Sequence, residues 1–166
     1  MTTLTKLHVQ IGQVKVAGPG QILSAILGSC IGLALLHPTR QVYGLAHCLL
    51  SDSGGTSHQI SGRHVDQALR SLVSLMELTP QELRKVQAIV TGGANMTMAP
   101  ETDPTRLVGS INASSAYKAV RGLGIRNLHD DTGGILGRQI NIDCTTGTFD
   151  IRQIPRLGGS HVSATK

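Results

Sequence analysis

The chain has 166 residues and a net charge of +5, and hydrophobic residues make up 40% of it. This length suits one domain with a real core. No apolar run approaches the roughly 18 residues of a membrane-spanning helix, and the N-terminus lacks the layout of a signal peptide. We therefore expect a cytoplasmic protein without membrane insertion. The basic residues are scattered and not interleaved with aromatics, which argues against nucleic acid as a partner and is compatible with an acidic protein partner.

The first third of the chain has strand patterns. Residues 7–16 alternate apolar and polar side chains and predict one strand, and residues 22–27 form a short apolar run. Residues 30–36 and 41–50 are apolar runs separated by the turn sequence HPTR, which predicts a hairpin.

The remainder mixes helix and strand patterns. Apolar residues at helical spacing predict helices over 61–78 and 110–124, and Thr79 with Glu82 marks the start of a short helix. Strands are expected at 86–93, 125–130 and in a closing hairpin over 138–154, with a long loop at 94–110 and a turn at 131–134. The sum is a single α+β domain over residues 1–166, with loose termini at about 1–6 and 158–166.

Cysteine and histidine spacing argues against disulfides and metals. The three cysteines, Cys30, Cys48 and Cys144, are odd in number and irregularly spaced, which favours a reducing compartment. No C-x-x-C or H-x-x-x-H pattern occurs, so we expect no metal site and no cofactor.

The predicted hairpin places one cysteine close to one histidine. A turn centred on Pro38 and Thr39 would place Cys30 directly opposite His47, with Cβ atoms about 4.5–5.5 Å apart. A thiol beside an imidazole is the minimum for nucleophilic catalysis by sulfur. Gly28 could adopt unusual backbone angles and let a substrate approach backbone N–H groups that bind an oxyanion. The alternative, commoner for a lone cysteine beside an apolar run, is a small buried hydrophobe.

Other polar or flexible residues have plainer interpretations. Cys48 and Cys144 are expected in the core. The glycine pairs 54–55, 92–93 and 133–134 lack the Walker pattern, so turns are favoured over phosphate-binding loops. The histidines other than His47 sit in polar or turn contexts and are expected at the surface: His8, His37, His58, His64, His129 and His161.

Four segments together resemble the CheD family of chemoreceptor glutamine deamidases: LGSCIGLALLHP, GLAHCLLSDSGG, VTGGANM and DDTGG. The similarity runs from about Gly12 to the glycines at 158–159. It implies layered, sandwich-like β-sheets with helices packed outside, a fold related to the catalytic domain of cytotoxic necrotizing factor toxins. It also implies that Cys30 is the nucleophile and His47 its partner. The third family residue, typically Thr, is here Ser24, which keeps a hydroxyl.

The resemblance further implies an activity and partners. Cys30 would attack a glutamine side chain of a chemoreceptor cytoplasmic domain, with backbone N–H groups around Gly28 and Ser29 holding the oxyanion. Asn95 and Met96 are candidates for substrate contact. A CheC-type phosphatase is a further expected partner. The alternative is a binding module for receptors or such a phosphatase with little or no catalysis, for which the change at Ser24 leaves room. An activated thiol would be alkylated rapidly well below the ordinary thiol pKa of about 8.5.

Overall fold

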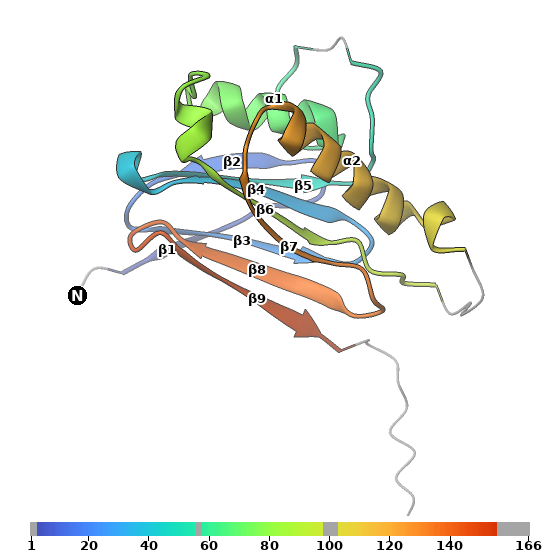
Figure 1. The fold of residues 1–166 in the computed structure, drawn as a ribbon. Helices are drawn as coiled ribbons and strands as arrows, with labels where there is room; N and C mark the ends of the chain where they lie inside the picture. Colours follow the sequence, from blue (N-terminus) through green and yellow to red (C-terminus); the bar gives the residue numbers. More distant parts are fainter. Residues whose placement is uncertain (1–2, 56–57, 98–102, 156–166) are drawn as a thin grey trace, which may run out of the picture.

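The computed structural model describes residues 3–55, 58–97 and 103–155, and these form three layers (Figure 1). Helices α1 (Val65–Leu75) and α2 (Val108–Gly122) cover one face of a five-stranded sheet. The other face of that sheet packs on a four-stranded sheet. The expected α+β class, with layered sheets and helices outside, is confirmed.

Each sheet draws strands from both ends of the chain. The five-stranded sheet has the order β2-β5-β4-β6-β7. Its strands are β2 (Val14–Ala17), β5 (Val42–Cys48), β4 (Ile31–His37), β6 (Gln87–Gly92) and β7 (Asn127–Thr132). The four-stranded sheet has the order β1-β3-β8-β9. Its strands are β1 (Thr5–His8), β3 (Gln21–Leu27), β8 (Gly137–Asp143) and β9 (Thr148–Ile154).

The central strand β4 is buried on both faces, which explains its unbroken apolar sequence. Ile31, Leu33 and Leu35 pack in the cluster under the helices. Ala34 and Leu36 alternate with them and pack in the second cluster, between the two sheets. Odd-numbered residues of β4 therefore point toward the helices, and even-numbered residues point toward the four-stranded sheet. We call the side of the five-stranded sheet that faces the four-stranded sheet its inner face.

Several predicted boundaries are wrong. The single strand expected over 7–16 is split into β1 and β2, because a turn containing Gly12 (φ +83°) carries the chain from one sheet to the other. Strand β1 begins at Thr5, so the chain at 5–6 is not loose. Helix α2 begins at Val108, and β7 continues through Thr132 into the expected turn.

Two further expectations have mixed outcomes. The short helix after Thr79 is a 3₁₀ turn, η2 (Glu82–Lys85), and Glu82 accepts a hydrogen bond from the Thr79 backbone N–H at 2.9 Å. A second 3₁₀ turn, η3 (Pro104–Arg106), lies in the expected long loop. The closing hairpin of β8 and β9 is confirmed. The expected loose tail lies outside the described residues.

The register of the β4–β5 hairpin differs from the prediction. Its connection is longer than a two-residue turn, because it contains the 3₁₀ turn η1 (Pro38–Arg40) followed by Gln41 at φ +51°. The residue opposite His47 is consequently Gly32, not Cys30. His37 closes this connection by accepting a hydrogen bond from the Arg40 N–H, and it is buried, contrary to the expected surface position.

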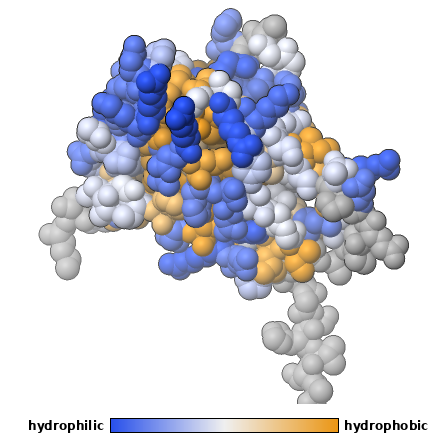
Figure 2. Space-filling view, in the orientation of Figure 1, coloured by the Kyte–Doolittle hydropathy of each residue, from blue (hydrophilic) through white to orange (hydrophobic). Residues whose placement is uncertain are grey.

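The surface in view is mostly polar, with apolar patches between the hydrophilic side chains (Figure 2). Neither α1 nor α2, nor any shorter helix in the described ranges, has the length and apolar content required to cross a bilayer.

Candidate active site

Cys30 and His47 lie on the same, inner face of the five-stranded sheet. Cys30 belongs to the cluster between the sheets. His47 follows Tyr43 and Leu45 at two-residue spacing, and both of these belong to the same cluster. Because Gly32 is opposite His47, Cys30 is its diagonal neighbour, a relation that separates Cα atoms by about 7–8 Å in a regular pair. The two residues share a face, but not the direct pairing that the sequence predicted.

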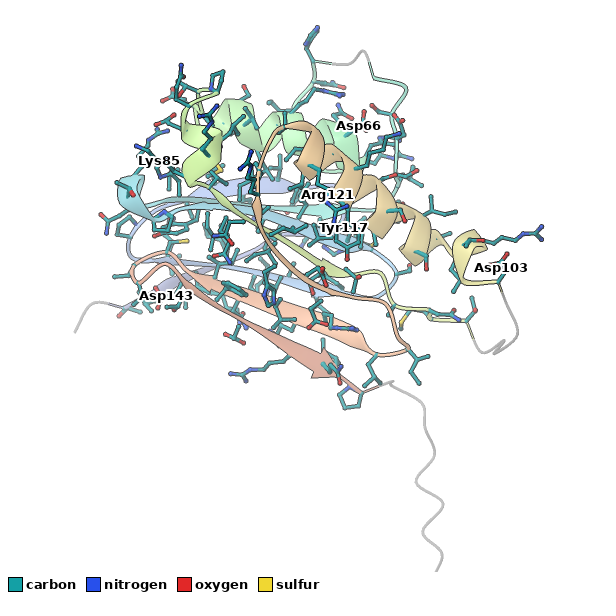
Figure 3. All side chains as sticks on the ribbon, in the orientation of Figure 1. Asp66, Lys85, Asp103, Tyr117, Arg121 and Asp143 are labelled. Atoms are coloured by element: carbon teal, nitrogen blue, oxygen red, sulfur yellow. The ribbon has the colours of Figure 1, made fainter. Side chains whose placement is uncertain are left out.

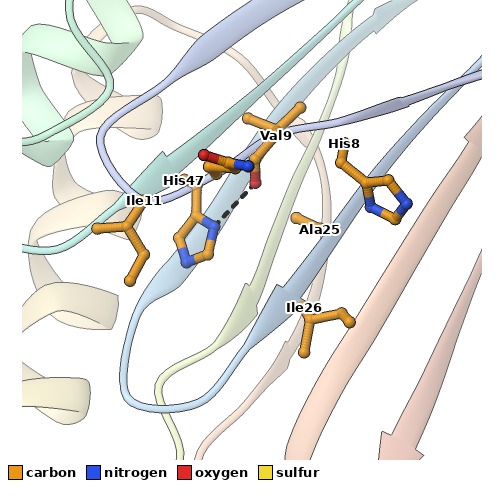
Figure 4. Close-up of a pocket in the computed structure, with 7 residues that line it drawn as sticks. His8, Val9, Ile11, Ala25, Ile26 and His47 are labelled. Atoms are coloured by element: carbon orange, nitrogen blue, oxygen red, sulfur yellow. Dashed lines mark hydrogen bonds between the residues drawn. The ribbon is translucent and has the colours of Figure 1, made fainter.

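The His47 ring is fixed by the backbone of Val9. Its Nδ1 lies 3.0 Å from the Val9 carbonyl oxygen (Figure 4). A carbonyl only accepts, so in the neutral ring Nδ1 carries the proton and Nε2 keeps its lone pair. Burial lowers the pKa of His47, and the hydrogen bond to Val9 opposes this shift in part. The structure therefore presents a neutral imidazole with a base at Nε2.

Ser24 does not reach His47 through its side chain. Its hydroxyl donates to Asn141 Oδ1 at 2.9 Å, across the β3–β8 pair. Its backbone carbonyl instead accepts from the Val9 N–H at 2.7 Å. Ser24 thus supports the residue that orients the ring, and the direct acceptor is a main-chain carbonyl that residue-type reasoning could not find.

Cys30 is nearly covered: the residue is 7% exposed. Burial raises the pKa of its thiol, and within the described residues the sulfur makes no hydrogen bond to the His47 ring. At neutral pH the resting site therefore holds a thiol and a neutral imidazole rather than a thiolate–imidazolium pair. The directions of these two pKa shifts favour slower alkylation of Cys30 than the sequence predicts.

The bend before β4 is held by the loop that follows β6. The Gly93 N–H donates to the Cys30 carbonyl at 2.9 Å, and the Ala94 N–H donates to the Gly28 carbonyl at 3.0 Å. Over the described ranges, the backbone N–H groups of Ser29 and Cys30 donate no hydrogen bond. They are available as donors beside the thiol. Gly28 does not have a positive φ, so the unusual backbone angles expected there are not used.

Gly92 makes this contact possible. It has φ +97°, and a Cβ added there would lie 2.3 Å from the Cys30 carbonyl oxygen. The 92–93 pair is thus a turn, as expected, and it holds the candidate nucleophile from behind. The pairs 54–55 and 133–134 also have positive φ, as turn glycines do.

A buried arginine, which sequence reasoning missed, supports the same loops from the other sheet. Arg138 of β8 is 3% exposed. Its guanidinium bonds Asp131 at 3.2 Å and the carbonyls of Gly133 and Leu136. These bonds hold the loop between β7 and β8. In that loop the Gly133 N–H donates to the Gly92 carbonyl at 3.0 Å. The only signal in the sequence was a lone arginine within an otherwise alternating strand.

Asn95 and Met96 lie beside this loop system. The Asn95 N–H donates to the Gly134 carbonyl at 2.8 Å, and its side-chain oxygen accepts from Thr97. Met96 is exposed and covers Gly28, where an added Cβ would lie 3.4 Å from its Cγ. Met96 is thus next to the candidate oxyanion donors, while Asn95 shapes the turn.

The other reactive groups have structural settings. Cys48 and Cys144 are fully buried, as expected, and burial raises the pKa of Cys144 to about 11. Carboxylates such as Asp66, Asp103 and Asp143 are dispersed over the molecule (Figure 3). No group of three or more His, Cys, Asp or Glu side chains arranged for a metal ion occurs in the part of the chain that the structure describes.

Comparison with known proteins places this arrangement in a family. The family model described as CheD chemotactic sensory transduction matches residues 49–153. A protein of Ruegeria sp. named probable chemoreceptor glutamine deamidase CheD 2 is 48% identical, over 95% of this chain and 97% of its own. The chain belongs to the CheD family. The matched range begins after Cys30 and His47, whereas the alignment with the Ruegeria protein covers nearly the whole chain.

More distant CheD proteins also align over most of the chain. The chemoreceptor glutamine deamidase CheD of Thermotoga maritima is 29% identical, over 90% of this chain and 92% of its own. A probable counterpart from Pyrococcus abyssi is 33% identical, over 93% and 94%. Among solved structures, YlmD from Geobacillus stearothermophilus is similar with a TM-score of 0.48 and 12% identity, over 74% of this chain and 51% of that one.

Proposed function

We propose that this chain is a chemoreceptor glutamine deamidase of chemotaxis signalling, with Cys30 as nucleophile and His47 as acid–base group. The observation that carries the proposal is the His47 ring. Its Nδ1 is held by the Val9 carbonyl, its Nε2 is left as a base, and it shares the inner face with Cys30. The family relation gives the substrate class, because the relatives are named chemoreceptor glutamine deamidases.

The chemistry follows from these groups. His47 Nε2 removes the Cys30 thiol proton as sulfur attacks the glutamine carboxamide carbon. The backbone N–H groups of Ser29 and Cys30, next to Gly28, stabilise the oxyanion. His47 then protonates the leaving nitrogen, which departs as ammonia and leaves a thioester. Water, deprotonated by the same ring, hydrolyses the thioester to glutamate and restores the thiol.

Within the described residues no hydrogen bond joins the Cys30 sulfur to the His47 ring. In this proposal, rotation of the short Cys30 side chain brings the sulfur to Nε2, or a water carries the proton between them. Raised thiol and lowered imidazole pKa values keep both groups neutral until then. Within this proposal Ser24 acts through its backbone carbonyl on Val9, and Met96 contacts substrate next to Gly28. Asn95 is proposed to contact substrate as well as shaping the turn.

A second candidate function is a binding module for chemoreceptors or a CheC-type phosphatase, without catalysis. The near-complete cover of Cys30 favours it, since a structural cysteine has the same burial. The free Nε2 of an oriented, inner-face histidine favours the enzyme. A CheC-type phosphatase is proposed as an additional partner of the enzyme.

Mass spectrometry of a receptor cytoplasmic domain tests the proposal. After incubation, each converted glutamine gains about one dalton, because NH₂ is exchanged for OH by way of the acyl intermediate. The Cys30→Ala and His47→Gln variants should lose this conversion and keep the fold by circular dichroism. Cys144→Ala, which removes a fully buried thiol, is the matched control and should retain it. Conversion by folded Cys30→Ala would overturn the mechanism.

A further inference from the structure

A groove lies beside the His47 ring at the edge where the two sheets meet. It has a volume of about 490 Å³ and is lined by His8, Val9, Gln10, Ile11, Ala25, Ile26 and His47. Figure 4 shows the His47 ring between Ile11 and Ile26, with Nδ1 turned toward Val9. The groove is thus continuous with the proposed catalytic base.

Exposed apolar side chains form part of the walls of this groove, beside the polar side chains of His8, Gln10 and His47. Ile11 is 58% exposed and Ile26 is 60% exposed, although both flank a histidine that is only 4% exposed. No lining residue is an aspartate, glutamate, lysine or arginine. Adjacent exposed apolar side chains of this kind mark interaction sites. The lining therefore fits apolar and uncharged groups rather than an anion.

One side of the groove is an open strand edge. Strand β1 pairs with β3 only as far as His8 opposite Ser24, whereas β3 continues to Leu27 beside β8. The Ser24 carbonyl points toward β1, where it accepts from Val9. Residues two apart on a strand direct their backbone groups to the same side. Ile26 therefore directs its N–H and C=O into the groove, where the described chain has no strand to pair with them.

We propose that this groove binds the polypeptide segment of the receptor that carries the reacting glutamine. Apolar substrate side chains next to that glutamine pack on Ile11 and Ile26, and the open edge at Ile26 bonds polar groups of the same segment. This inference rests on the proposed function and assigns it a specificity surface. Two features fit a protein segment in particular. The groove adjoins His47, and its exposed isoleucines lie next to backbone groups of Ile26 that an extended peptide can hydrogen-bond.

Steady-state kinetics with a receptor cytoplasmic domain test the groove. Ile11→Ser and Ile26→Ser should each raise KM about fivefold, and the double variant more than tenfold, with kcat changed less than twofold. The rate of Cys30 alkylation by iodoacetamide should stay at the wild-type value, because the small reagent does not use the groove. Ile11→Val and Ile26→Val, which keep an apolar wall, should restore KM.

The matched control is Leu75→Ser, an exposed apolar residue at the end of α1 and outside the groove. It should leave KM unchanged. An unchanged KM in the folded double variant would overturn the inference and leave the deamidase proposal intact. A fall in kcat at constant KM would overturn it too, because the isoleucines would then act on the catalytic step.

Direct binding separates the groove from the chemistry. Affinity for the receptor domain is measured by calorimetry with the Cys30→Ala protein, alone and carrying both isoleucine changes. A loss of affinity of more than tenfold with the double change supports the groove even if wild-type protein fails to deamidate. Equal affinities, or no binding by Cys30→Ala protein, would overturn it.

Discussion

The imidazole of His47 is oriented by the main chain of Val9, whose carbonyl oxygen lies 3.0 Å from Nδ1. The Val9 N–H in turn donates to the Ser24 carbonyl at 2.7 Å. The His47 ring is therefore positioned by backbone that joins the two sheets, which no side-chain substitution removes directly. In a triad, the residue that orients the histidine sets the tautomer, and here that requirement is met without a third side chain.

The hydroxyl of Ser24 should matter for stability and little for catalysis. Ser24→Ala removes the donor to Asn141 Oδ1 and should lower the free energy of unfolding by about 1 kcal/mol. Loss of a directly orienting group costs up to about 10⁴-fold in rate, so a deamidation rate close to wild type is expected instead. Asn141→Ala is the control and should reproduce the stability change. A large loss of kcat in Ser24→Ala alone would show that the hydroxyl does act on His47.

The pH dependence should reflect two neutral groups. Because burial raises the pKa of Cys30, its alkylation rate should keep rising above pH 8.5, the ordinary thiol range being about 8–9. Because burial lowers the pKa of His47, the base form persists in acid, and the acid limb of kcat/KM should lie below about pH 6.5. The alkylation rate of Cys30 is measured by quenching the reaction at set times and mapping the modified peptides. Rapid alkylation at pH 6 would instead indicate a resting thiolate–imidazolium pair.

Gly92 should tolerate no side chain. Gly92→Ala combines φ +97° with a Cβ 2.3 Å from the Cys30 carbonyl oxygen, so it must displace the bend that carries the candidate nucleophile. We expect a loss of more than about 2 kcal/mol of stability by chemical denaturation, together with loss of deamidation. Gly54→Ala is the matched control: φ is +82° and nothing lies within 4 Å of the new Cβ. It should cost only the backbone strain of about 1 kcal/mol. Equal effects of the two changes would contradict the close contact.

Arg138 should couple the second sheet to the site. Arg138→Met leaves Asp131 and two loop carbonyls without their donor, which should cost about 2–3 kcal/mol because Asp131 is itself partly exposed. The 133–136 loop should loosen, with faster amide hydrogen exchange at Gly133 and Asn95. Arg152→Met removes an exposed pair with Asp150 and should cost less than about 1 kcal/mol. Unchanged exchange at Gly133 would argue against this coupling.

The sequence by itself determined the class of fold, the family and the identity of the candidate nucleophile and base. Apolar runs of strand length, two amphipathic helical segments and the CheD motifs carry that information locally, because each depends on residue type and short spacing. The turns at 92–93 and 133–134 were predictable for the same reason, since glycine supplies positive φ.

Only the tertiary structure decided how Cys30 and His47 are set relative to each other. The register of β4 and β5 depends on the 3₁₀ turn and the left-handed Gln41 between them, which moved Gly32 opposite His47. The Val9 carbonyl, the support from Gly92 and Arg138, and the open edge at Ile26 all involve contacts between segments distant in sequence. Main-chain groups are the same in every residue, so the contacts they make become visible only when the sheets are packed together.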